Sequence, residues 1–166
     1  MVGFTESTAL NIISEKAQSI KTSTDTIDIF KQAMDLNLLQ KTSDNRLSFS
    51  HEMYQEYFCA EELLTIQEKD KTIIESLQDN PDWEEPIILF SGLIHDNKEI
   101  TLNISQVNPH LAVKCIQSFT NHVPELNQMV VDITLNNLTL FTNKNESYKN
   151  YKRAITYTSN YVNCNE

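Results

Sequence analysis

The chain has 166 residues and a formal net charge of −10 at pH 7. Because an acidic protein repels phosphate backbones, this charge argues against unaided binding to nucleic acid. Only two glycines occur, Gly3 and Gly92. This low number of glycines argues against a β-rich fold with many tight turns and against a glycine-rich phosphate-binding loop.

The first part of the chain predicts two helices followed by a β-hairpin. Apolar residues recur at helical spacing from residue 6 to 20, and again from a cap at Ser23 or Thr24 to Met34. A polar turn over residues 43–46 then separates two short runs, which favours a hairpin. Two helices and a hairpin form the tail of a winged-helix unit, in which the hairpin is the wing.

The next predicted helix runs from a cap at Ser50 to about Gln67. Its expected core residues are Met53, Tyr57, Phe58, Ala60 and Leu64. The charged stretch 68–71 follows and favours a boundary. We therefore expect a winged-helix domain over residues 1–67 and a helical-repeat region over residues 68–166.

The second region predicts helices that begin at capping residues or prolines. A short amphipathic helix is expected around residues 73–77, and Asp82 with Glu85 has the spacing of a capping box. The pair Asn108-Pro109 marks the start of another helix. Further helices are expected after Pro124 and around Tyr148, Tyr151 and Ile155.

These patterns together predict a mainly α fold. A winged-helix remnant with a small β-hairpin is expected first, followed by stacked α-helical hairpins similar to HEAT repeats. In such a repeat, each helix pair buries its apolar face against the next pair.

None of the common catalytic or metal-binding patterns is complete in this sequence. His51-Glu52 begins like a metalloprotease motif, but Gln55 stands where the second histidine is needed. The sequence contains no P-loop pattern and no G-x-S-x-G element. We therefore expect no catalytic residue, no metal ligand and no enzymatic activity.

Cysteine usage and hydropathy predict a cytoplasmic protein. The three cysteines are widely spaced and odd in number, which is typical of reduced thiols. The start of the sequence does not resemble a signal peptide, and no apolar stretch is long enough to span a bilayer.

His51 is the strongest single candidate for a binding residue. It falls at the start of a predicted helix, where exposed backbone N–H groups and the helix dipole favour an anion such as phosphate. The alternative is a histidine that only packs against the wing. The residues alone leave both readings open.

The segment LSFSHEMYQEYFCAEEL, residues 47–63, resembles the F-x-H-x-x-F-Q-E-Y-F-A-A-x-x-L signature of NACHT-type signalling NTPases. The matching residues are Phe49, His51, Gln55, Glu56, Tyr57, Phe58, Ala60 and Leu63. Tyr54 and Cys59 depart mildly from it. Two later runs, residues 81–94 with Trp83 and residues 108–116, are similar to the helical region of bacterial members.

This resemblance implies a non-catalytic regulatory and interaction part of a nucleotide switch protein. In that family an NTPase core precedes the winged helix and binds ADP or ATP with Mg²⁺. A winged-helix histidine, matched here by His51, reaches the β-phosphate of ADP in the resting form. The P-loop and the Mg²⁺-binding acids are not in this sequence. We therefore expect a piece of a longer protein, with no cofactor of its own.

The resemblance also implies the partners. They are the upstream NACHT core, acting within the same polypeptide, and an unidentified protein ligand or effector; nucleic acid and membranes are not expected. One alternative is a stand-alone helical-repeat adaptor. Another is a winged-helix DNA-binding regulator, which the glutamates at positions 52, 56, 61 and 62 oppose because they would face phosphates.

Overall fold

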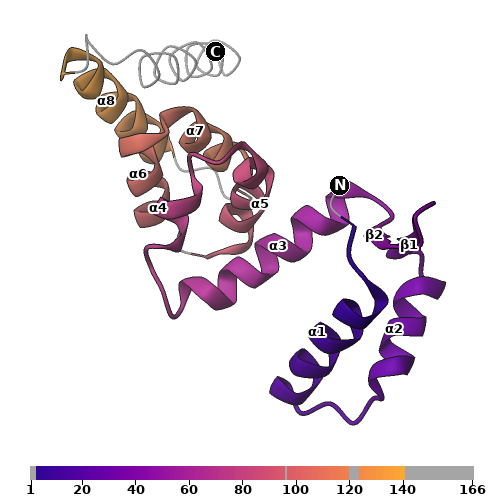
Figure 1. Cartoon of the computed structure of the whole chain (residues 1–166). Helices are drawn as coiled ribbons and strands as arrows, with labels where there is room; N and C mark the ends of the chain where they lie inside the picture. The colour runs from indigo at the N-terminus through magenta and orange to yellow at the C-terminus, as the bar shows by residue number, and fades with distance from the viewer. Residues whose placement is uncertain (1–2, 96, 120–123, 141–166) are drawn as a thin grey trace. The chain divides into compact units, whose positions relative to one another are not determined.

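A computed structural model describes residues 3–95, 97–119 and 124–140. Within these ranges the chain is mainly helical, with helices α1 to α8, a single 3-10 turn and a two-stranded hairpin (Figure 1). The predicted fold class, mainly α with a small hairpin, is confirmed. The chain divides into two compact units, Met1–Gln55 and Glu56–Glu166. The expected domain boundary after residue 67 stays a prediction, because compactness alone does not define a domain.

The first unit contains two helices and the hairpin. The elements are α1 (Glu6–Ser19), α2 (Thr26–Asp35), β1 (Leu39–Lys41) and β2 (Leu47–Phe49). The strands pair antiparallel, with Leu39 opposite Phe49 and Lys41 opposite Leu47. Phe4 bonds Leu47 through both backbone groups, at 2.9 and 2.8 Å, so a third backbone segment extends the hairpin. The core of this unit is formed by Ala9, Phe30, Leu39 and Leu47.

Both helices of the first unit begin at a side-chain cap. The Thr5 hydroxyl accepts the N–H of Thr8 at 3.1 Å, and the Asp25 carboxylate accepts the N–H of Ile27 at 2.8 Å. The predicted cap at Ser23 or Thr24 is therefore wrong by one or two positions. The Asp25 carboxylate bonds a free N–H group in the first turn of α2, and its negative charge suits the positive end of the helix dipole.

Both helices end in a Schellman motif, which places a non-glycine residue in the left-handed region. After α1, Lys21 has φ 53°, and Thr22 donates its N–H to the Ala17 carbonyl at 3.2 Å. After α2, Asn37 has φ 55° and takes the same position. Left-handed geometry strains a side chain with a Cβ, and asparagine tolerates it better than lysine.

We expect Lys21→Gly to raise the free energy of unfolding by about 1 kcal/mol, since glycine has no Cβ to clash at positive φ. Urea unfolding of both proteins measures this difference. Asn37→Gly is the matched control, and its gain should be smaller. A loss of stability in Lys21→Gly would mean that the Lys21 side chain makes a compensating contact.

The second unit is a bundle of short helices. Helix α3 (Glu52–Gln67) runs through the boundary between the units and is followed by the remaining elements. These are α4 (Ile73–Leu77), the 3-10 turn η1 (Pro81–Trp83), α5 (Glu84–Leu93), α6 (Lys98–Val107), α7 (Pro109–Gln117) and α8 (Pro124–Leu140). Helix α7 packs against α5, α6 and α8, so it is the central element of this unit.

The core of the second unit combines residues from α3 to α8. Its fully buried members include Ala60, Leu63, Ile87, Phe90, Ile104, Leu111, Cys115, Leu126 and Val130. Helix α5 contributes Ile87 and Phe90 to this core. The helix predicted after Pro124 is confirmed as α8, which contributes Leu126 and Val130 to this core.

The start of α5 differs from the prediction. Asp82 and Glu85 do not form a capping box; instead the Asn80 side chain accepts the N–H of Asp82 at 3.1 Å and caps η1. Pro81 is the first residue of this turn, and α5 begins two residues after Asp82 without a side-chain cap. The predicted helix start at Asn108-Pro109 is confirmed, because the Asn108 side-chain oxygen accepts the N–H of Leu111 at 3.1 Å.

Candidate functional site

The segment Ser50-His51 joins the hairpin to α3 and contains the histidine singled out in the sequence. Ser50 donates its N–H to the Leu38 carbonyl at 3.0 Å, and its hydroxyl donates to the Asn37 carbonyl. Ser50 therefore does not cap α3 as predicted. These hydrogen bonds connect the segment before α3 to the residues that follow α2, Asn37 and Leu38.

His51 is exposed and precedes the first residue of α3. Its ring meets the ring of Tyr54 edge-on, with centroids 5.6 Å apart and planes at 70°. The His51 carbonyl accepts the N–H of Tyr54 at 3.1 Å. The imidazole thus stands at the positive end of a helix, in an orientation supported by an aromatic neighbour, where it can donate to an anion. The exposed carboxylate of Glu52 opposes such an anion.

The other signature residues are divided between the two units, and Phe49 and Trp83 each pack against the core of their unit. In the first unit, Phe49 is half-buried against the core, with its ring 6.3 Å from that of Phe4. Gln55, also in this unit, is half-buried. In the second unit, Glu56 is half-buried and Trp83 packs against the core.

Two signature aromatics do not have the predicted role. Tyr57 and Phe58 are exposed, as is Met53, whereas Ala60 is fully buried and Leu64 is partly buried against the core. Residues in an α-helix advance by about 100° each, so Phe58 lies nearly opposite Ala60 and Leu63, whereas Tyr57, three residues before Ala60, lies at the edge of their side. The prediction that Tyr57 and Phe58 form core is wrong.

The cysteine thiols of the described residues are poor nucleophiles. Burial raises the pKa of the Cys115 thiol to about 12, so this thiol is protonated at neutral pH. Burial also raises the pKa of the half-buried Cys59 thiol, with a further contribution from Glu56. Neither environment contains the cationic neighbour that activates a catalytic cysteine.

The acidic, histidine and cysteine side chains of the described residues do not form a metal-binding cluster. No group of three His, Cys, Asp or Glu side chains there could hold a metal ion. No described helix is long and apolar enough to cross a membrane. The helix expected around Tyr148, Tyr151 and Ile155 lies outside the described residues.

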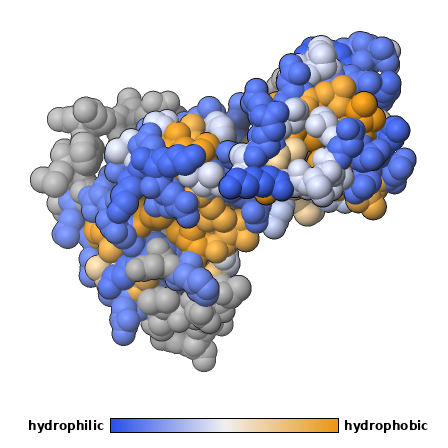
Figure 2. All heavy atoms as spheres, turned by 90° about the horizontal axis from the view of Figure 1, so that it is seen from below, coloured by the Kyte–Doolittle hydropathy of each residue, from blue (hydrophilic) through white to orange (hydrophobic). Residues whose placement is uncertain are grey.

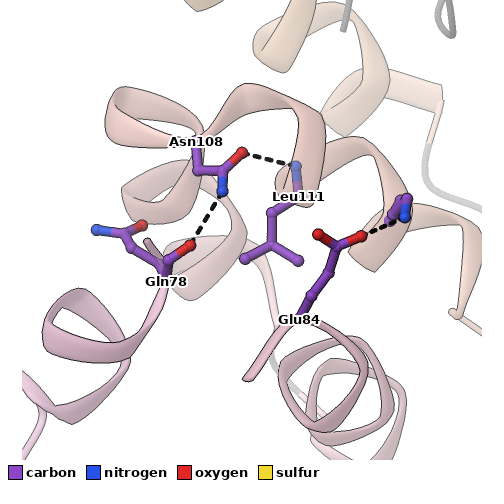
Figure 3. A network of polar contacts seen from close by, with 5 residues as sticks. Gln78, Glu84, Asn108 and Leu111 are labelled. Carbon is purple, nitrogen blue, oxygen red and sulfur yellow. Dashed lines mark hydrogen bonds and ion pairs between the residues drawn. The ribbon is translucent and has the colours of Figure 1, made fainter. Parts of the chain in front are cut away.

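A polar network at the start of α7 has a structural role that the sequence did not reveal in full. Asn108 caps α7 and also donates its side-chain N–H to the Gln78 carbonyl at 3.0 Å (Figure 3). Glu84 on α5 forms an ion pair with Lys114 on α7 (Figure 3). The cap was predictable from the Asn-Pro pair, but the contacts to Gln78 and Lys114 depend on tertiary packing.

Comparisons with protein-family models, curated proteins and solved structures found no match for this chain.

Proposed function

We propose that this chain is a non-catalytic regulatory and interaction part of a NACHT-type nucleotide switch protein that acts in the cytoplasm. The observation that supports the proposal best is the position of His51. It is exposed at the first turn of α3, directly after a hairpin that two helices precede. A histidine that contacts a phosphate in such a switch needs this exposure and this helix terminus.

The proposed mechanism is a contact that depends on the bound nucleotide. With ADP in an upstream NTPase core, the His51 imidazole donates to the β-phosphate, and the N-terminus of α3 supports the negative charge. Exchange for ATP removes that contact. The loss biases an equilibrium between two domain arrangements, since a ligand shifts such an equilibrium by its different affinity for the two states.

The chain by itself should bind ADP only weakly. One imidazole and one helix terminus supply few contacts, and Glu52 repels the phosphates, so we expect a dissociation constant weaker than about 1 mM by titration calorimetry. Binding of ADP to this chain at micromolar concentration would contradict the proposal. It would indicate a complete nucleotide site within these residues.

In the full-length protein, His51→Ala should release ADP faster and favour the active state. The expected cause is the loss of one charge-assisted hydrogen bond, which corresponds to a roughly tenfold or greater weakening of ADP retention. His95→Ala is the matched control, because His95 is also exposed but lies in the second unit. Equal ADP retention in both variants and in the wild type would remove the sensing role from His51.

The reading frame upstream of this chain separates the proposal from its main alternative. A P-loop encoded there, in frame with this sequence, is expected if the chain belongs to a nucleotide switch. A gene that lacks a P-loop would favour a stand-alone helical-repeat adaptor.

A further inference from the structure

We draw no further inference here: the strongest candidate, the apolar surface that the first unit exposes around α1 and α2 at Ile12, Ile20 and Ile27 (Figure 2), carries no proposal because nothing in the described part of the chain shows what covers it.

Discussion

Phe90→Ala should lower the free energy of unfolding of the second unit, Glu56–Glu166, by about 3–5 kcal/mol. Phe90 lies on α5 and is fully buried in the cluster that also contains Ile87, Leu111 and Cys115. Removing the ring deletes its buried apolar surface and leaves a cavity, because close-packed neighbours relax only partly. Urea unfolding followed by circular dichroism measures the change.

Phe58→Ala is the matched control, since it makes the same chemical change at an exposed position. Its expected cost is below about 1 kcal/mol, as for most surface substitutions. If the two variants lose equal stability, either Phe90 is not the core residue described here or Phe58 is covered in solution. The oligomeric state of the wild type would distinguish these explanations.

Asn108→Ala should destabilise the chain by about 2–3 kcal/mol, because it removes two contacts made by one side chain. The carbonyl oxygen of the side chain caps α7 through the N–H of Leu111, and the side-chain N–H group donates to the Gln78 carbonyl. Both contacts are partly buried, so water replaces them poorly.

Asn108→Ser separates these two contributions. Serine keeps an oxygen for the cap but is too short to bond the Gln78 carbonyl, so its cost should be about half that of alanine. Asn80→Ala is the control, since Asn80 caps only the exposed turn η1, and about 1 kcal/mol or less is expected. A cost at Asn108 no greater than at Asn80 would show that the bond to Gln78 contributes nothing.

Elements with local sequence signals were predictable from the sequence. An asparagine followed by proline marks a helix start, because the asparagine side chain supplies the cap, as at Asn108-Pro109. The same pair at Asn80-Pro81 caps η1, where the prediction was a capping box at Asp82 instead. The hairpin was also predictable, because a polar turn separates its two short strands. Its left-handed residue, Asn45 at φ 60°, belongs to the residue types that tolerate this geometry.

Helix α6 gave no clear signal because its buried face is partly polar. Thr101 and Ser105 are fully buried. The Thr101 hydroxyl donates to the carbonyl of the N-cap residue Asn97 at 2.7 Å, and the Ser105 hydroxyl donates to the Leu102 carbonyl at 2.6 Å. A pattern of apolar residues at helical spacing cannot reveal a helix that buries hydroxyls in this way.

The candidate site was predictable in position but not in surroundings. The place of His51 at the start of a helix followed from sequence spacing. The bond from Ser50 to the Asn37 carbonyl did not follow, because it depends on how the hairpin folds back on the end of α2. The exposure of Tyr57 and Phe58 did not follow either, because it depends on tertiary packing around α3. Hydropathy assigns aromatic residues to the core, and tertiary packing decides otherwise here.

Trp83 is the single tryptophan of the chain, and it packs against the core of the second unit. Intrinsic tryptophan fluorescence therefore reports on the second unit, whereas the unit Met1–Gln55 has no indole and is silent in that signal. Far-ultraviolet dichroism reports on helices of both units. Coincident transitions in the two signals mean that the units unfold as one cooperative block, and separate transitions mean that the break at Gln55 inside α3 is also a thermodynamic boundary.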